Sequence, residues 1–293
     1  RRVGTDGIIT TIAGMGTVVA GFGGFSGDGG PAVQAELNGP RDVTVDAKGN
    51  IYIADGGNSG HIRRIGTDGI ITTIAGAQGG MPSTFIPGES SGLATQAFMS
   101  PQAVAIDGQG NIYILGLRVF RIGLDGIITT FAGSRWSGTG GFSGDGGPAS
   151  QAVLNFPSDI AVDENGYVYI ADRDNHRIRR VTPDGIITTF AGGRSDGDGG
   201  PAIQANLYYP PKIAMDTKGN KYILGQNNRD QNSWSWLIRR ISPDGIIVTV
   251  AGTRRILPMQ SDLFLLGDGK PATQVDLLSP SDIAVDEKGN LYI

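Results

Sequence analysis

The stretch "DGIITTIAG" at residues 6–14 decides the fold, because the chain repeats it along its whole length. The other copies are "DGIITTIAG" at 68–76, "DGIITTFAG" at 125–133, "DGIITTFAG" at 184–192 and "DGIIVTVAG" at 244–252. Successive copies begin 62, 57, 59 and 60 residues apart. The Asp-Gly pair predicts a tight turn, and the β-branched run after it predicts a strand. A repeat of this length, built from short strands, predicts the blades of a β-propeller.

One unit, residues 41–76, contains four predicted strands with short turns between them. The strands are "RDVTVDA", "NIYIAD", "HIRRI" and "IITTIAG". The first alternates apolar and polar residues, as a half-buried strand does, and Gly49 with Asn50 predicts a tight turn after it. Four strands in a meander make one four-stranded antiparallel blade. The only helical candidates are short segments such as residues 31–37, where a proline suits the first helical position.

The two ends of the chain carry complementary halves of one unit. Residues 281–293 match the first two strands and residues 1–14 match the last two. We therefore expect an all-β, five-bladed propeller in which strands from both termini share one blade and close the ring, which removes exposed sheet edges. The expected domain is a single propeller over residues 1–293, with blades at 40–76, 101–133, 157–192, 210–252 and 280–293 plus 1–14.

Composition argues against several classes of function. The net charge is −4 and no basic run is present, which argues against a nucleic-acid partner because phosphate binding needs a face rich in Lys and Arg. The chain has no cysteine, so disulfides and thiolate metal sites are excluded. No apolar stretch approaches about 18 residues, so the sequence predicts no membrane span.

Two segments resemble NHL repeats: "PRDVTVDAKGNIYIADGGNSGHIRRI" at 40–65 and "PSDIAVDENGYVYIADRDNHRIRRV" at 157–181. The shared markers are a "VD" turn, the strand "YIAD" and the "IRR" strand that follows. The insert "GFSGDGGPA" at 24–32 and 141–149 resembles bacterial proteins of the NHL type. This resemblance implies a β-propeller used mainly for binding. Six blades are commoner among NHL propellers, so it leaves five and six blades as alternatives.

One acidic residue stands at the same position of four inserts. These residues are Asp28, Asp145, Asp198 and Asp268. Their functional interpretation is an acidic ring that binds Ca²⁺ or a cationic ligand. Ca²⁺ needs about six to eight converging oxygen ligands, which one carboxylate per blade does not supply. We therefore expect a structural role, each Asp capping the turn before a short helix. We expect no cofactor, with Ca²⁺ as the alternative.

His61 and His176 are the only histidines of the chain. Related propeller lyases use metal and histidine chemistry, and a catalytic zinc site usually takes three protein ligands. Two histidines do not fill such a site without carboxylates. We therefore expect no metal site and no catalytic residue, and we interpret each histidine as packing on its own blade.

Arginine pairs recur on the third strand of the units. They are Arg1-Arg2, Arg63-Arg64, Arg179-Arg180 and Arg239-Arg240. Neighbouring residues on a strand point to opposite faces. We expect one arginine of each pair to contact an acidic residue or to stack between blades, and the other to be solvated.

The binding candidates are residues that the repeat does not require. They are Trp234 and Trp236 in the longest loop between second and third strands, Arg135 and Trp136 at the start of one insert, and Leu263 and Phe264 in an apolar insert at 255–266. Trp and Arg are enriched among interface hot spots, and an exposed apolar patch marks a contact surface. The alternative is that these side chains only cover the blade ends.

These observations predict a binding scaffold, and they favour a non-enzyme over an enzyme. The expected partner is a protein or peptide recognised by the face that carries the inserts, in an extracellular or cell-surface location. One alternative is a metal-dependent propeller enzyme of the lyase or lactonase type. The other is a structural protein that self-assembles, as a homo-oligomer, through its propellers.

Overall fold

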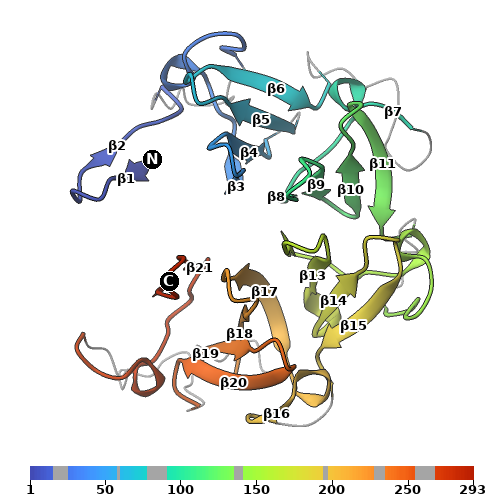
Figure 1. The fold of residues 1–293 in the computed structure, drawn as a ribbon, viewed down its shortest axis with the longest axis vertical. Coiled ribbons are helices and arrows are strands. Elements are labelled where there is room, and N and C mark those ends of the chain that lie inside the picture. The colour runs from blue at the N-terminus through green and yellow to red at the C-terminus, as the bar shows by residue number, and fades with distance from the viewer. Residues whose placement is uncertain are drawn as a thin grey trace. The chain divides into compact units, whose positions relative to one another are not determined.

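A computed structural model describes residues 1–15, 26–57, 60–77, 91–134, 141–193, 197–227, 235–254 and 268–293 (Figure 1). The chain divides into two compact units, Arg1–Phe131 and Ala132–Ile293. Every regular element within these ranges is a short strand or a single 3₁₀ turn. Among the described residues, no helix is long and apolar enough to cross a membrane.

The first unit contains a short hairpin followed by two blades. The strands are β1 (Arg2–Val3), β2 (Ile9–Thr10), β3 (Pro40–Val45), β4 (Ile51–Asp55), β5 (His61–Ile65), β6 (Ile71–Ala75), β7 (Gly92–Leu93), β8 (Ala103–Ile106), β9 (Ile112–Leu115), β10 (Val119–Ile122) and β11 (Ile127–Ala132), the last of which ends one residue into the second unit. Blade 1 is the antiparallel sheet β3-β4-β5-β6, and blade 2 is β8-β9-β10-β11 with β7 added outside β11. The inner strands β3 and β8 pack against each other.

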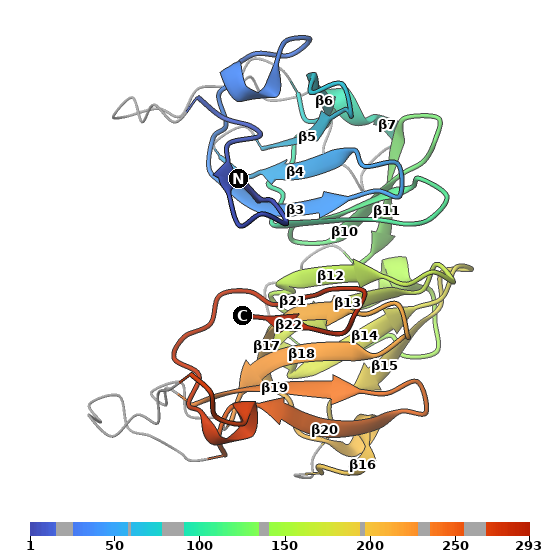
Figure 2. The ribbon, with the colours of Figure 1, turned by 60° about the vertical axis from the view of Figure 1, so that its left-hand side comes forward.

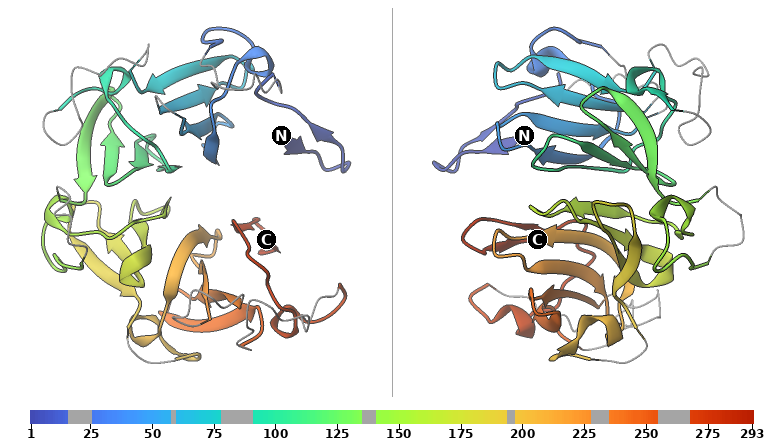
Figure 3. Two further views of the ribbon diagram at one scale, coloured as in Figure 1. Left: turned by 180° about the vertical axis from the view of Figure 1, so that it is seen from behind. Right: turned by 45° about the vertical axis from the view of Figure 1, so that its right-hand side comes forward.

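The second unit contains two more blades and a second short hairpin. Its strands are β12 (Asp159–Val162), β13 (Val168–Asp172), β14 (Arg177–Val181), β15 (Ile187–Ala191), β16 (Gly200–Pro201), β17 (Tyr208–Met215), β18 (Lys221–Gln226), β19 (Trp236–Ile241), β20 (Ile246–Ala251), β21 (Ala284–Val285) and β22 (Leu291–Tyr292). Blade 3 is β12-β13-β14-β15, and blade 4 is β17-β18-β19-β20 with β16 outside β20 (Figure 2). Both sheets twist, as further views show (Figure 3).

The described residues form four complete blades rather than the expected five. The terminal strands form two separate two-stranded sheets, β1-β2 and β21-β22. Each of these strands is only two residues long. In the repeat, β22 corresponds to the second strand of a blade and β1 to the third. They do not pair because no loop connects them, whereas a short loop holds these two strands together in the other blades.

An aspartate organises the first turn of every blade. In blade 1, Asp46 accepts hydrogen bonds from the backbone N–H groups of Lys48 and Asn50 and from the Tyr52 hydroxyl, at 2.9, 2.9 and 3.1 Å. Gly49 completes the turn with a φ of 85°, which a residue with a Cβ adopts only at a cost. The recurrent tyrosine therefore packs in the blade and uses its hydroxyl to hold the turn.

The inserts lie against the outer strand of the blade that follows them. Gly29 donates its N–H to the Ile71 carbonyl at 2.9 Å, and Ile71 donates back to Gly30 at 3.0 Å. β7 and β16 occupy the corresponding places beside β11 and β20. The helix expected near residues 31–37 is only the 3₁₀ turn Ala32–Gln34. It is this short because buried Ala32 and Ala35 fix it against the sheet.

Candidate functional site

Blade 1 buries an arginine between two carboxylates. The Arg63 side chain has no exposed surface, and its guanidinium lies 2.9 Å from Asp28 Oδ1 and 4.0 Å from Asp55 Oδ2. Asp55 also accepts the backbone N–H of Asn38 at 2.7 Å. Burial raises the pKa of Asp55, while the Asn38 N–H and the Arg63 charge act against that rise. A buried charge is tolerated only when it is paired in this way.

Blade 3 repeats the arrangement with different partners. Arg179 is fully buried, and it lies 2.8 Å from Asp145 Oδ1 and 3.4 Å from Asp172 Oδ2. Asp172 accepts the Asn155 N–H at 2.7 Å and the Asn175 side-chain amide at 2.8 Å. Burial raises the pKa of Asp172, and these hydrogen bonds together with Arg179 oppose the rise. The arginine thus ties an insert to the second strand of its blade.

Three insert aspartates, Asp28, Asp145 and Asp198, contact arginines rather than cap a helix. Asp28 and Asp198 each also accept a backbone N–H from the outer strand, from Thr73 and Thr249 at 3.1 and 3.0 Å. The expected turn cap does not form because the insert runs beside the outer strand and directs the carboxylate toward the third strand. Asp268 is exposed. No three His, Cys, Asp or Glu side chains in the described ranges are grouped to hold a metal ion.

In two of the pairs the second arginine is not simply solvated, contrary to expectation. Arg64 donates to Asn50 Oδ1 at 2.7 Å, and Arg121 of blade 2 donates to Asn111 Oδ1 at 2.8 Å. The Arg180 guanidinium stacks over the Tyr167 ring at 5.2 Å. These side chains are drawn back onto the first turn of their own blade because that turn presents an amide or an aromatic ring.

Both histidines make contacts within the blades. His61 is buried, and its Nε2 lies 3.2 Å from the carbonyl oxygen of Ala77, on the same blade. Burial lowers the pKa of His61. His176 accepts the Tyr209 N–H at Nδ1, at 3.1 Å, and its ring meets the Tyr209 ring edge-on at 4.4 Å. His176 therefore contacts the next blade rather than only its own.

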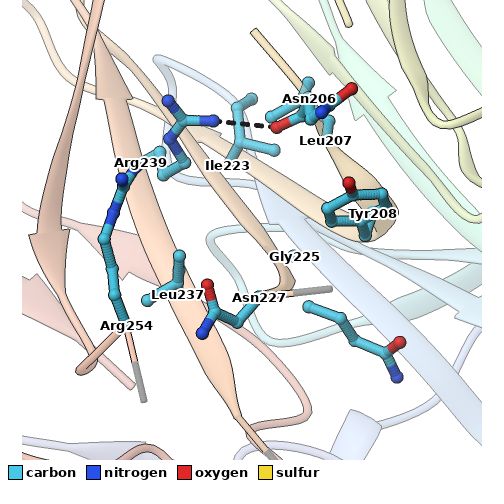
Figure 4. Close-up of a pocket in the computed structure, with 10 residues that line it drawn as sticks. Asn206, Leu207, Tyr208, Ile223, Gly225, Asn227, Leu237, Arg239 and Arg254 are labelled. Carbon is cyan, nitrogen blue, oxygen red and sulfur yellow. Dashed lines mark hydrogen bonds between the residues drawn. The ribbon is translucent and has the colours of Figure 1, made fainter. Parts of the chain in front are cut away.

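Blade 4 differs from blades 1 and 3 and contains a pocket (Figure 4). The cavity has a volume of about 280 Å³. Its lining residues are Asn206, Leu207, Tyr208, Ile223, Gly225, Gln226, Asn227, Leu237, Arg239 and Arg254. They come from the start of β17, the end of β18, the start of β19 and the segment after β20. The pocket therefore opens at the end of the blade from which its inserts leave.

Two arginines and one aspartate set the charge beside this pocket. Arg239 Nη2 lies 2.7 Å from Asp198 Oδ1, and Arg254 Nη2 lies 3.3 Å from Asp198 Oδ2. Arg239 also donates to the carbonyl oxygens of Asn206 and Gly197 at 2.8 and 2.7 Å. Burial disfavours the charge of Asp198, but bonds from Thr249 and Arg239 outweigh it and hold the pKa of Asp198 below its usual value.

Among the sequence-predicted binding residues, the structure describes only Trp236. It is partly buried against a cluster that includes Tyr222 and Leu224, and it forms a backbone bridge with Leu277. Trp236 pairs with Gln226 across the β18-β19 ladder, and Gln226 lines the pocket. The other five, Trp234, Trp136, Arg135, Leu263 and Phe264, lie outside the described residues, and their binding role stays a prediction.

Sequence reasoning missed the pocket residues. The available signal was a broken repeat: "YIAD" in blades 1 and 3 becomes "YILG" at 222–225 in blade 4. The next strand still carries Arg239, the counterpart of the arginines that Asp55 and Asp172 face in blades 1 and 3. Comparing the blades position by position would have pointed to Gly225.

Four-stranded blades, a turn aspartate bonded to the tyrosine of the second strand, and an arginine on the third strand define an NHL-type propeller. The family model described as the teneurin NHL domain matches residues 6–92 and 138–196. The chain belongs to the NHL-repeat β-propeller family, and its fold is an all-β propeller. The bacterial character expected of the inserts remains a prediction.

The relatives that match are animal proteins. Teneurin-1 of Mus musculus is 31% identical over 225 residues, which cover 69% of this chain and 8% of that protein. Teneurin-4 of Homo sapiens is 32% identical over 225 residues, with the same 69% and 8% covered. The match thus spans less than a tenth of the length of these relatives.

A solved structure resembles the fold. It is an auxiliary nutrient binding protein from Bacteroides ovatus, with a TM-score of 0.53 and 17% sequence identity. The match covers 85% of this chain and 54% of that one. At this identity the likeness concerns the fold alone, because one propeller shape hosts unrelated activities.

Proposed function

We propose that the chain is a non-enzymatic binding module that recognises a protein or peptide, and that the blade 4 pocket is part of its recognition surface. The observation that carries the proposal is the pocket lining. It combines three side-chain amides (Asn206, Gln226, Asn227) with an aromatic ring and two guanidinium groups. Groups of this kind orient a ligand through a few hydrogen bonds within a mostly enclosed site.

The size of the pocket favours a side chain as its occupant. Sites for drug-sized ligands hold about 300–1,000 Å³, and the blade 4 cavity, at about 280 Å³, is just below that range. A single residue of an extended peptide fills a space of this size, and the rest of the peptide would contact the blade end around it. Trp236, together with the predicted residues Trp234, Trp136, Arg135, Leu263 and Phe264, belongs to this proposed surface.

Panning a phage-displayed peptide library against the purified chain tests the proposal. Enriched peptides should lose binding to a double variant, Asn227→Ala with Arg254→Ala, which alters the pocket lining. Arg173→Ala is the matched control, because its side chain is 42% exposed against 49% for Arg254 and lies on the neighbouring blade. Peptides that bind the double variant as well as the parent would show that recognition does not use this pocket.

Two wider aspects belong to the same proposal. The terminal hairpins β1-β2 and β21-β22 are complementary halves of the repeat, and we propose that they form one closing blade. We also propose that the module works outside the cell or at its surface, alone or as a homo-oligomer. Surface labelling of cells that express the full-length protein tests the location, and light scattering of the purified chain tests the oligomeric state.

A further inference from the structure

The first turn of blade 3 lacks a residue that the equivalent turns share. In those turns an asparagine side chain donates its amide to Oδ2 of the turn aspartate, at 2.7 or 2.8 Å; the pairs are Asn50 with Asp46, Asn111 with Asp107, Asn220 with Asp216 and Asn290 with Asp286. Blade 3 has Tyr167 in place of this asparagine. Asp163 Oδ2 therefore accepts the Tyr169 hydroxyl at 3.1 Å but no side-chain amide from its own turn.

The blade that follows carries a matching exception at the start of its second strand. This position is apolar in the other units, where it is Ile51, Ile112, Val168 or Leu291, and it is Lys221 in blade 4. The positions are equivalent, because Lys221 pairs with Ile241 of the third strand as Ile51 pairs with Ile65. Lys221 is only 8% exposed. A buried ammonium group costs free energy that an aliphatic side chain does not, so this lysine needs a specific partner.

The two exceptions meet between blades 3 and 4. Lys221 Nζ lies 3.8 Å from Asp163 Oδ2, the oxygen that lacks the asparagine amide, and 4.9 Å from the centre of the Tyr169 ring. It also donates to the Gly219 carbonyl oxygen at 3.0 Å. Burial lowers the pKa of Lys221, and the charge of Asp163 opposes that fall. The ammonium group thus contacts a carboxylate of the preceding blade that the other turns neutralise with their own amide.

The third strand of blade 3 is adapted to the same change. In blade 1, Arg64 donates to Asn50 Oδ1 at 2.7 Å. In blade 3, the Arg180 guanidinium stacks over the Tyr167 ring at 5.2 Å. The tyrosine therefore replaces the asparagine as the contact of the arginine, but its ring has no amide for the aspartate. That second role is left to the neighbouring blade.

The junction between blades 1 and 2 shows the ordinary arrangement. Asp46 Oδ2 already accepts the Asn50 amide and the Tyr52 hydroxyl, at 2.7 and 3.1 Å. Ile112 of blade 2 packs against the apolar cluster that contains Tyr52. A lysine at this position would lose its hydration without gaining an acceptor that still needs a donor. A blade that carries the lysine therefore fits best after a blade that lacks the asparagine.

We propose that Lys221 is the residue by which blade 4 recognises blade 3, because it supplies from the next blade the donor that the Asp163 turn has lost. The pair Tyr167 and Lys221 then fixes the order of two blades whose strands are otherwise alike. Such a device has a clear use, since repeat proteins misassemble when their units are interchangeable. The inference is independent of the proposed peptide-binding function.

A double-mutant cycle on the full chain, followed by thermal unfolding, tests the pairing. Lys221→Met keeps the length of the side chain and removes its charge, and it should lower the melting temperature by at least about 4 °C. Combined with Tyr167→Asn, which restores the turn amide, the same substitution should cost less than half as much. Lys218→Met is the matched control at an exposed position, and it should stay within about 1 °C of the parent.

Moving the pair to another junction tests whether the two residues suffice. Ile112→Lys places a lysine beside the blade 1 turn and should lower the melting temperature, because Asp46 already has Asn50 as a donor. Adding Asn50→Tyr removes that donor and should recover at least half of the loss. The control adds Asn111→Tyr instead, which alters the turn of blade 2 itself and should recover nothing.

Three results would overturn the inference. They are an unchanged melting temperature for Lys221→Met, equal losses from this substitution with and without Tyr167→Asn, and equal recovery by Asn50→Tyr and Asn111→Tyr. If Lys221→Met alone does not fold, recovery of folding by the added Tyr167→Asn supports the inference. Failure of both the single and the double variant to fold contradicts it.

Discussion

Arg63 and Arg179 show how single residues hold this fold together. Each is fully buried and joins an insert carboxylate to a carboxylate at the end of the second strand. The recurrence of the arginine pairs predicted that one member contacts an acidic residue. It did not identify the partner, because Asp145 and Arg179 are 34 residues apart and no local periodicity relates an insert to a strand that far along the chain.

Removing one insert carboxylate should destabilise the second unit. Asp145→Ala should lower the free energy of unfolding by about 2–4 kcal/mol, because breaking a buried pair leaves Arg179 less compensated. Urea denaturation measures the change. The control is Glu164→Ala, at an exposed turn position, which should stay within about 0.5 kcal/mol. Equal effects of the two substitutions would contradict the structural role of Asp145.

The turn aspartates predict an acid-sensitive fold. Burial disfavours the charge of Asp216, but hydrogen bonds from Asn220, Lys218 and Tyr222 outweigh it and hold its pKa below 3.8. Because the pKa of Asp216 is lower in the folded than in the unfolded protein, its charged form stabilises the fold at pH values above the unfolded pKa of about 3.9. This stabilisation is lost as the pH falls through the folded pKa. Asp55 and Asp172 have raised pKa values and act in the opposite direction. Their protonated forms stabilise the fold at pH values below the unfolded pKa, and this stabilisation is lost as the pH rises through the folded pKa.

Asp216→Asn isolates the turn contribution. It should cost about 1–2 kcal/mol at pH 7, where an acceptor of several bonds is weakened. The difference from the parent should stay constant between pH 7 and 5 and shrink toward pH 3, because the parent loses its own charged acceptor there. Denaturant titrations at these three pH values measure it. A difference that does not change with pH would show that the charge of Asp216 adds nothing.

At the scale of elements, the strands were predictable and the inserts were not. The β-branched runs and Asp-Gly turns place β3–β6 and β17–β20 close to their expected positions, because strand and turn signals are local. The inserts carry no such signal. Gly29 and Gly30 bond to the outer strand at Ile71, and neither glycine has a side-chain pattern that marks a strand. The pocket depends on one departure from the repeat, Gly225, and is visible only by comparing blades.

Two glycines of one insert should respond differently to the same substitution. A Cβ on Gly144 would lie 2.7 Å from Ala152 Cα, whereas a Cβ on Gly146 would meet nothing within 4 Å. Both have positive φ, 90° and 81°, so each alanine carries a backbone cost of about 1–2 kcal/mol. Gly144→Ala should add about 1–3 kcal/mol more from overpacking. Thermal unfolding compares the two, and equal losses would show that the insert is not packed as described.

At the scale of the whole molecule, the repeat arithmetic identified the propeller but not the number of complete blades. Sequence spacing counts units, and it counted five copies of "DGII". A complete blade also requires its four strands to form one hydrogen-bonded sheet, and the described residues form four such sheets. The fifth set depends on pairing between the two ends of the chain, for which the sequence offers complementarity but no connection.

An engineered crosslink tests the closing blade. In blade 1, Tyr52 is paired with Arg64, and the repeat makes Tyr292 and Arg2 the equivalent residues. Because the chain contains no cysteine, the double variant Arg2→Cys with Tyr292→Cys has one disulfide available. Under oxidising conditions it should form within one chain and raise the melting temperature, since it closes a long loop.

Arg2→Cys with Leu124→Cys is the control, because Leu124 is an exposed residue of a blade 2 turn and has no place in the closing blade. Mass spectrometry of the oxidised proteins detects the bond. If both pairs crosslink equally, or neither does, the terminal hairpins do not share a blade.

The hydrogen bonds and ion pairs between each insert and the blade after it determine which segment of this protein could be moved as one unit. A piece cut at the strand boundaries would lose the residues that cover its outer edge and the aspartate that neutralises its buried arginine. The unit that keeps its own edge and its own arginine partner is the insert together with the four strands that follow, so for the first blade it starts near Ser26 and not at Pro40. Engineers who add, delete or exchange blades should therefore join them after the fourth strand, near Gly76 or Gly192, and carry each linker with its downstream neighbour.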